Sequence, residues 1–208
     1  IAEVKRKSPS KGDLFPELDP AMLAKQYFDG GAACLSVLTD NPHFGGSAKD
    51  LEDASAAVDL PVLRKDFTVD AIDVLDARLM GADAVLLIAA ALSSAELKHF
   101  YLLAREIGLD VLVEVHDERE MEAALEVGAD LVGVNQRDLY TFEVDHERAM
   151  RMAALVPPGV IGVAESGVRG PEDAAVLNEA GYHAVLVGET LVTSGDPAAA
   201  VSALRGSH

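Results

Sequence analysis

Short, nearly continuous apolar segments alternate along this chain with longer segments in which apolar residues recur every three or four positions. The first pattern is typical of parallel strands buried on both faces, and the second of helices that bury one face. The alternation predicts eight strands within residues 1–5, 30–37, 61–65, 81–88, 110–115, 128–134, 160–164 and 181–187. Four of these segments begin with a glycine, which we interpret as the residue that ends the preceding helix.

Helices are expected between these strands, and several begin with a proline or a capping side chain. Their predicted ranges are 19–29, 47–57, 70–80, 93–104, 117–125, 145–155, 171–177 and 197 onwards. In the third helix Ile72, Leu75 and Leu79 share a face, so we expect these side chains to point inward. Asp117 and Glu120 have the spacing of a reciprocal capping box.

Eight strand–helix units with short connections predict a closed (β/α)8 barrel, the TIM-barrel fold of the α/β class, as one domain over residues 1–208. An open doubly wound sheet is the alternative. Such a sheet would more naturally carry a glycine-rich loop after its first strand, and this chain has Lys7-Ser-Pro-Ser10 there. The closed barrel is therefore the favoured fold.

Composition narrows the classes of partner. The net charge of −18 argues against nucleic acid or an anionic membrane surface, and no apolar run is long enough to span a bilayer. The single cysteine, Cys34, excludes an internal disulfide and fits a reducing compartment, so we expect a cytoplasmic protein. The six histidines lack ligand-like spacing, so no metal site is predicted. We expect a monomer or a weak homo-oligomer.

Charged side chains gather where the predicted strands end. Because side chains alternate along a strand, Glu3 and Lys5 share one face of the first strand. In a barrel the carboxyl ends of all strands meet at one rim, where active sites lie. The charged side chains expected at this rim are Glu3, Lys5, Lys65, Glu114, Arg137 and Glu165. A single pair of opposite charges, such as Glu3 and Lys5, could be a structural ion pair. A ring of several acidic and basic side chains is suited to proton transfer.

The last two strands end differently, with Ser166-Gly167 and Gly188-Glu189. Loops at these positions of a barrel commonly bind phosphate through backbone N–H groups and a short extra helix. Residues 189–192 could form that helix. The alternative is that the glycines only permit tight turns.

Taken together, these residues resemble the indole-3-glycerol-phosphate synthase family, the barrel enzymes of tryptophan biosynthesis. The E-x-K-x-x-S-P-S motif from Glu3 and the L-x-K-D-F motif from Leu63 are the most specific parts of the resemblance. The matching stretches are 1–10, 36–39, 61–67, 85–88, 112–115, 133–139, 164–168 and 186–189. They include part of every predicted strand.

The resemblance implies a reaction without metal or cofactor. The substrate would be 1-(2-carboxyphenylamino)-1-deoxyribulose 5-phosphate, which undergoes ring closure, loses CO2 and then loses water. Lys65 matches the lysine that protonates the sugar carbonyl oxygen. Glu3, Lys5 and Glu114 match the candidates for dehydration, and their division of roles stays open. Asn135 and Ser166 match catalytic positions near the anthranilate and hydroxyl groups.

The resemblance also assigns binding roles. Ser8, Gly167 and Gly188 match phosphate-site positions. Arg137 would support the acidic residues or bind the substrate carboxylate, and Glu165 belongs to the same rim. An apolar slot for the aryl ring would be lined by Phe44, Phe67 and Leu86.

Two departures from the family pattern stand out. Glu189 replaces a serine found in some members, which removes a hydroxyl contact to phosphate. Members usually have an N-terminal helix and loop before the first strand, and we expect this chain to lack that extension. The competing hypotheses are a sugar-phosphate isomerase on a related barrel and an inactive, truncated barrel scaffold.

Overall fold

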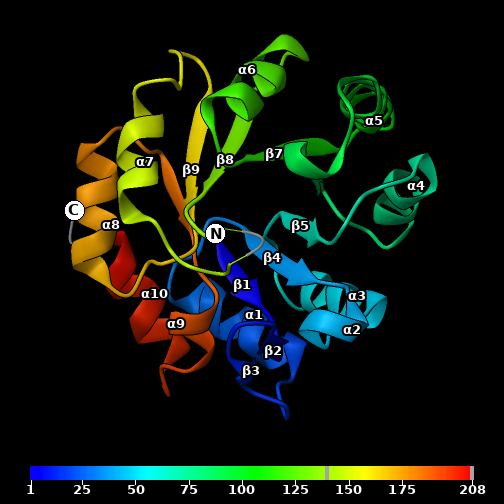
Figure 1. Cartoon of the computed structure of the whole chain (residues 1–208). Helices are drawn as coiled ribbons and strands as arrows, with labels where there is room; N and C mark the ends of the chain where they lie inside the picture. The colour runs from blue at the N-terminus through cyan, green and yellow to red at the C-terminus, as the bar shows by residue number, and fades with distance from the viewer. Residues whose placement is uncertain (139–140, 207–208) are drawn as a thin grey trace.

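Eight parallel strands follow one another in chain order around a barrel. The structure, a computed structural model, describes residues 1–138 and 141–206, and in these residues the strands are β1 (Ala2–Val4), β4 (Leu35–Leu38), β5 (Val62–Lys65), β6 (Ala84–Ile88), β7 (Asp110–Val115), β8 (Leu131–Asn135), β9 (Ile161–Glu165) and β10 (Ala184–Leu186). The last strand meets the first through Glu3 N–H, which donates to Val187 O at 2.9 Å, and Val187 N–H, which donates to Ile1 O at 3.0 Å. The predicted closed barrel is confirmed (Figure 1).

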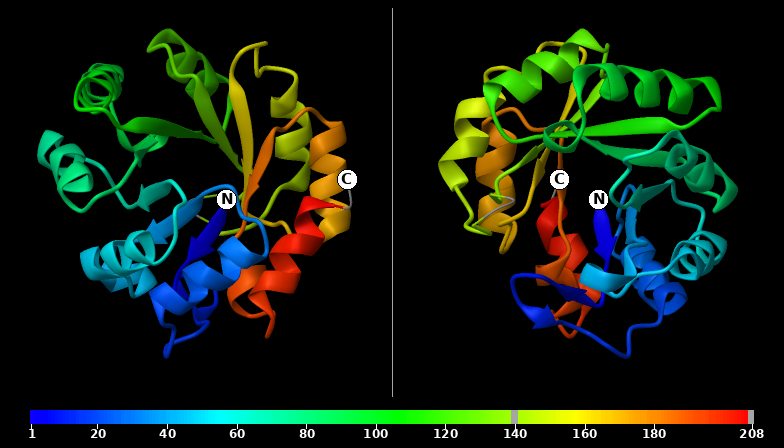
Figure 2. Two further views of the ribbon diagram at one scale, coloured as in Figure 1. Left: turned by 180° about the vertical axis from the view of Figure 1, so that it is seen from behind. Right: turned by 45° about the vertical axis from the view of Figure 1, so that its right-hand side comes forward.

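Helices cover the outside of this barrel, as both views in Figure 2 show. The long helices of the described residues are α1 (Pro20–Asp29), α3 (Ala48–Ala57), α4 (Ala71–Leu79), α5 (Ser94–Glu106), α6 (Glu118–Glu126), α7 (His146–Ala153), α8 (Pro171–Glu179) and α10 (Pro197–Arg205). Side-chain caps fix where several begin. The Asp19 carboxylate accepts from the first turn of α1, and Ser93 and Glu96 form a reciprocal capping box on α5.

Two apolar layers hold the barrel together. The larger layer lies between the strands and the surrounding helices and includes fully buried Tyr27, Leu87 and Met121. The smaller layer fills the barrel interior and consists of Leu63, Leu86, Ile88, Leu112, Val163 and Leu186. Interior side chains of this kind make the barrel a packed core rather than a pore. The polar rim is therefore built on a rigid floor.

Short elements follow several of the strands, among them a 3-10 helix, η1 (Ala89–Ala91), after β6. A hairpin of β2 (Lys7–Ser8) and β3 (Gly12–Asp13) follows β1, α2 (Asn41–Phe44) follows β4, and α9 (Glu189–Val192) follows β10. The helix α9 confirms the short helix expected there, whereas the hairpin and α2 were not predicted. The Arg6 guanidinium secures the hairpin, because it pairs with the Asp50 carboxylate and donates to Leu18 O at 3.0 Å.

The predicted inward face of α4 is wrong. Ile72, Leu75 and Leu79 are exposed, and Val74 and Ala77 are the buried residues of this helix. Two apolar stripes fit the helical period, and backbone anchors select the second. Arg64 of β5 donates to Asp73 O at 2.7 Å, and a capping box fixes the first turn, so the rotation of the helix is set at its start.

The cap of α6 also differs from the prediction. Asp117 does accept from Glu120 N–H, but the Glu120 carboxylate passes Asp117 and accepts from His116 N–H at 2.8 Å. A further structural finding is that none of the described helices is long and apolar enough to cross a membrane.

Candidate active site

Lys65, at the end of β5, lies among three carboxyl groups. Its Nζ is 3.6 Å from Glu3 Oε2, 3.8 Å from Glu114 Oε2 and 3.2 Å from Glu165 Oε2. These carboxyl groups come from β1, β7 and β9, on different sides of the barrel. The alternation expected from the sequence thus brings four strand ends to one point, and each of the three glutamates is buried.

Lys5 completes this cluster from the first strand. Its Nζ lies 2.7 Å from Glu3 Oε1, so Glu3 sits between two ammonium groups. The backbone of Glu3 is fixed from behind by the buried Tyr27 hydroxyl, which donates to Glu3 O at 2.9 Å. Burial opposes ionisation of the Glu3 carboxyl, but the charges of Lys5 and Lys65 outweigh burial and lower its pKa.

Asn135 and Ser166 extend the cluster along the rim. The Asn135 Nδ2 amide donates to Glu114 Oε1 at 3.0 Å, and its Oδ1 accepts from the Ser166 hydroxyl at 2.8 Å. Ser166 has a φ of 64°, an uncommon left-handed conformation for a residue with a side chain. The buried Gln136 amide holds this turn, because it donates to Ser166 O at 2.7 Å.

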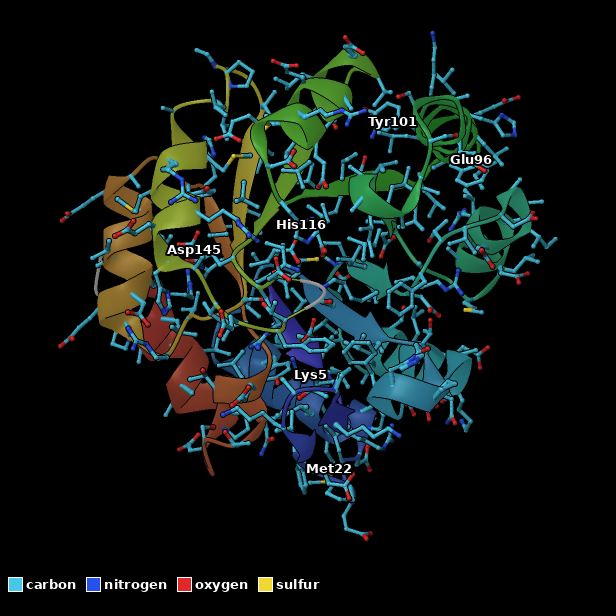
Figure 3. All side chains as sticks on the ribbon, viewed as in Figure 1. Lys5, Met22, Glu96, Tyr101, His116 and Asp145 are labelled. Carbon is cyan, nitrogen blue, oxygen red and sulfur yellow. The ribbon has the colours of Figure 1, made fainter. Side chains whose placement is uncertain are left out.

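The sequence reasoning missed His116 as a residue of this cluster. Its Nε2 lies 3.4 Å from Glu114 Oε1, and its Nδ1 lies 3.0 Å from Glu120 Oε2. Figure 3 shows His116 near the middle of the molecule, whereas Met22 and Glu96 lie at the periphery. The signal was available, because Leu112, Glu114 and His116 alternate along one face at the end of β7.

The cluster contains groups with strongly altered acidity. Burial favours the neutral form of Lys65, but the carboxyl groups of Glu165, Glu3 and Glu114 outweigh it and raise the pKa of the ammonium well above its usual range. Burial opposes the charge of Glu114 too, yet His116, Lys65 and Asn135 lower its pKa to about 2. Burial dominates at Glu165 and, with the charge of Glu114, raises its pKa to about 8 despite the opposing effect of Lys65.

These acidities assign charge at neutral pH. Glu3 and Glu114 are carboxylates, Glu165 keeps its proton, and Lys65 is an ammonium ion. One side of the rim can therefore donate protons while another accepts them. Altered acidities of this kind, produced by burial together with specific charged partners, are characteristic of catalytic sites.

Arg137 lies beside this cluster but faces its own loop. The guanidinium donates to Phe142 O at 2.8 Å, and the backbone N–H donates to Asn135 Oδ1 at 3.0 Å. Among the described residues, no ion pair joins Arg137 to the buried glutamates, so this geometry does not give the expected support of the acids. Leu139, which ends the matching stretch 133–139, lies outside the described residues.

The three predicted lining residues of the aryl slot lie at different depths. Phe67 is 46% exposed, and its ring makes an edge contact with His43 of α2 at 6.1 Å between centroids. Phe44 is the last residue of α2 and is partly buried. Phe44 follows β4 and Phe67 follows β5, so both phenylalanine rings lie on the side of the rim near these two strands. Leu86 is only 2% exposed and belongs to the interior layer. It therefore lies beneath the expected aryl slot and does not line its side.

The residues expected at the phosphate site lie on β2, in the turn after β9 and directly before α9. Ser8 is buried on the hairpin, and Lys11 of the same hairpin lies 3.9 Å from Glu189 at the start of α9. Gly188 precedes α9 directly, and Gly167 has a φ of 73° after β9. The Glu189 carboxylate thus lies beside the Lys11 ammonium group.

Within residues 1–138 and 141–206, no cluster of three or more histidine, cysteine, aspartate or glutamate side chains has a geometry that could hold a metal ion. The glutamates of the rim instead surround an ammonium group. The chemistry that this arrangement supports is proton transfer between side chains of opposite charge.

Comparison with solved structures identifies barrels of the same fold. Thiamine phosphate pyrophosphorylase from Pyrococcus furiosus superimposes with a TM-score of 0.71, covering 98% of this chain and 91% of that chain at 18% identity. N-acetylmannosamine-6-phosphate 2-epimerase from Clostridium perfringens gives a TM-score of 0.72 at 15% identity, covering 93% and 88%. At such identities the likeness concerns the fold alone.

Comparison of sequences is more specific. The family model described as indole-3-glycerol phosphate synthase matches residues 1–204. An indole-3-glycerol phosphate synthase from Nocardioides sp. is 54% identical over 206 residues, which are 99% of this chain and 79% of that protein. One from Streptomyces coelicolor is 52% identical over 206 residues, which are 99% of this chain and 80% of that protein. The chain belongs to the indole-3-glycerol phosphate synthase family of tryptophan biosynthesis, with the activity of that enzyme.

Proposed function

We propose that this enzyme is a carbon–carbon lyase that converts 1-(2-carboxyphenylamino)-1-deoxyribulose 5-phosphate into indole-3-glycerol phosphate at the rim centred on Lys65. The observation that carries the proposal is the position of the Lys65 ammonium, within 3.2–3.8 Å of carboxyl groups from three other strands. The same family resemblance supports a cytoplasmic enzyme, and the net charge of −18 supports a small-molecule partner rather than nucleic acid.

Ring closure makes the first demand on the site. The aryl carbon that bears the carboxylate attacks the ketone carbon of the sugar, and the carbonyl oxygen takes up a proton. Lys65 is the proposed acid, because it is protonated at neutral pH and only partly covered, with 15% of its side chain exposed. An ammonium group close to this oxygen stabilises the negative charge that develops there. Loss of CO2 then restores the aromatic ring.

Dehydration makes the second demand, because one group must protonate the departing hydroxyl while another removes a proton from the neighbouring carbon. Glu114 is the proposed base, since its low pKa keeps it ionised in a buried place. Lys5, which lies 2.7 Å from Glu3, is a proposed acid. Asn135 and Ser166 would hold the hydroxyl through the hydrogen-bond chain that joins them to Glu114.

The two ends of the substrate match different groups of residues on the rim. Phe44 and Phe67 would contact the flat aryl ring, over a floor that includes Leu86. Backbone N–H groups near Gly167 and Gly188, together with Ser8, would bind the phosphate. Arg137 would bind the substrate carboxylate after leaving Phe142 O, and Glu165, as a neutral carboxyl, would bind without repelling that anion.

The test is the appearance of indole fluorescence when the carboxyphenylamino substrate is added. We expect turnover by the wild type, and Lys65→Ala should lower kcat on the order of a hundredfold or more. The variant should fold, because Glu3 keeps its contact with Lys5 and Glu114 keeps His116 and Asn135. Lys25→Ala, on the exposed surface of α1, is the matched control and should turn over like wild type.

Either of two results would contradict the proposal. Absence of product with the wild-type enzyme would refute the reaction itself. Turnover of Lys65→Ala within a few-fold of wild type, at equal thermal stability, would show that Lys65 is not the acid.

A further inference from the structure

His116 occupies a gap between two glutamates, and the roles given above do not use it. On one side its Nδ1 lies 3.0 Å from Glu120 Oε2, and on the other its Nε2 lies 3.4 Å from Glu114 Oε1. Its side chain is 11% exposed, so the ring is enclosed at the point where β7 meets α6. A histidine between two acids is held as an imidazolium ion when both acids are ionised.

The helix α6 fixes this histidine from outside the cluster. The Glu120 carboxylate accepts a hydrogen bond from the backbone N–H of His116 at 2.8 Å. The same carboxylate oxygen is also hydrogen-bonded to the ring Nδ1 of His116. Glu120 is itself held, because its own N–H donates to the Asp117 carboxylate at 2.8 Å. The start of α6 thereby fixes the position of the His116 ring, whose Nε2 lies at ion-pair distance from Glu114 without a hydrogen bond to it.

We propose that His116 is a positioning residue for the reaction: as an imidazolium ion clamped by Glu120, it aims the Glu114 carboxylate at Lys65 and keeps it ionised. The inference rests on the proposed role of Glu114 as a base and extends it one residue outward. Lys65 attracts Glu114 from β5 and Asn135 donates to it from β8, so His116 supplies the third contact, from its own strand.

The charged and titratable groups around this pair come from three other elements. Glu120 faces His116 from α6, and Lys65 and Glu165 lie beyond Glu114 on β5 and β9. Burial favours the neutral imidazole, but Glu114 and Glu120 outweigh burial and raise the pKa of His116 to about 9. The imidazolium charge is therefore present throughout the neutral range and is lost above it.

Removal of the Glu120 charge tests whether His116 positions Glu114 for catalysis or only stabilises the fold. Glu120→Gln keeps an oxygen that can accept from His116 N–H, but it removes one of the two charges that hold the ring protonated. We expect the pKa of His116 to fall by about one unit or more. If the imidazolium ion supports catalysis, the alkaline decline of kcat should move to lower pH by the same amount, while KM changes less than about twofold.

The experiment records the histidine ring signals by NMR and the pH profiles of kcat and KM for wild type, Glu120→Gln, His116→Gln and His99→Gln. His99 is exposed on α5 and serves as the matched control, so its variant should behave like wild type. For His116→Gln we expect kcat to fall on the order of tenfold, because a misplaced base slows the chemical step. Thermal melting verifies that each variant is folded.

Three results would overturn the inference. The first is a wild-type His116 ring that titrates near 6.5 in the absence of substrate. The second is a Glu120→Gln variant whose His116 pKa falls while its kcat profile stays unchanged. The third is an active wild type whose His116→Gln variant keeps kcat within twofold from pH 6 to 9. Failure of the wild type to form product would instead refute the proposed function, because the NMR titration needs no substrate.

Discussion

Replacement of Glu165 by glutamine should stabilise the protein at alkaline pH, although it removes an ionisable residue from the active site. Glu165 is 1% exposed, and Lys65 Nζ, at 3.2 Å, is its ion-pair partner. Neither carboxyl oxygen has a hydrogen-bond partner among the described residues. A carboxyl group in such a place resists ionisation, so burial raises the pKa of Glu165 to about 8.

The sign of the effect follows from proton binding. Between the ordinary carboxyl value of 4.5 and about 8, the folded protein keeps the Glu165 proton while the unfolded chain has lost it. Stability therefore falls as pH rises through this window. At about 1.4 kcal/mol per pH unit, the upper limit of the loss is roughly 5 kcal/mol, and coupling to Lys65 and Glu114 should reduce it to about 2–3 kcal/mol.

The assay is urea unfolding, followed by circular dichroism, from pH 5 to 8.5. Glu165→Gln should match wild type near pH 5 and exceed it by about 2 kcal/mol or more at pH 8.5, because glutamine is neutral at every pH. Glu122→Gln, on the exposed surface of α6, controls for the change in net charge. Equal stabilities of Glu165→Gln and wild type over the whole range would refute the reasoning.

Further outcomes follow from the same geometry. Glu114→Gln should lower kcat much more than it raises KM, because the amide keeps a hydrogen bond but cannot accept a proton; unchanged kcat with raised KM would make Glu114 a binding residue only. Inorganic phosphate should inhibit competitively, and crystals grown in sulfate that show the ion only away from Gly167 and Gly188 would count against that site. Gly188→Ala should lower kcat by about tenfold or more by displacing Glu3 and Lys5, and full activity would disprove this packing argument.

Much of the site could be predicted because the barrel itself brings it together. Alternation along strands gives the inward face, and closure places all carboxyl ends at one rim. Glu3, Lys65 and Glu114 therefore meet, as expected, although Lys65 lies 62 positions after Glu3 and Glu114 lies 49 positions after Lys65. These contacts follow from the closure of the barrel, so they could be predicted without information about which residue pairs touch.

Prediction failed where two arrangements satisfy the same pattern. On α4 both the stripe with Leu75 and the stripe with Val74 have the helical period, and the Arg64 contact to Asp73 O is a tertiary interaction that periodicity does not contain. The prediction that Arg137 supports the acidic residues failed for a similar reason. Its position at the end of β8 was recognised, but a long side chain can reach several partners, and here it reaches Phe142 O.

Two glycines show why some of the site lies beyond pattern reasoning. Gly188 has a φ of −121°, so it does not occupy the left-handed region that favours glycine. A Cβ atom at 188 would collide with the carboxylate of Glu3 and lie 2.8 Å from Lys5 Nζ, and one at Gly133 would overlap the carboxyl group of Glu165. Both glycines therefore provide volume for charged side chains from neighbouring strands. The sequence suggested Gly188 through its possible phosphate loop. Because Gly188 also makes room for Glu3 and Lys5, the proposed anion site and the acid–base geometry would depend on the same residue.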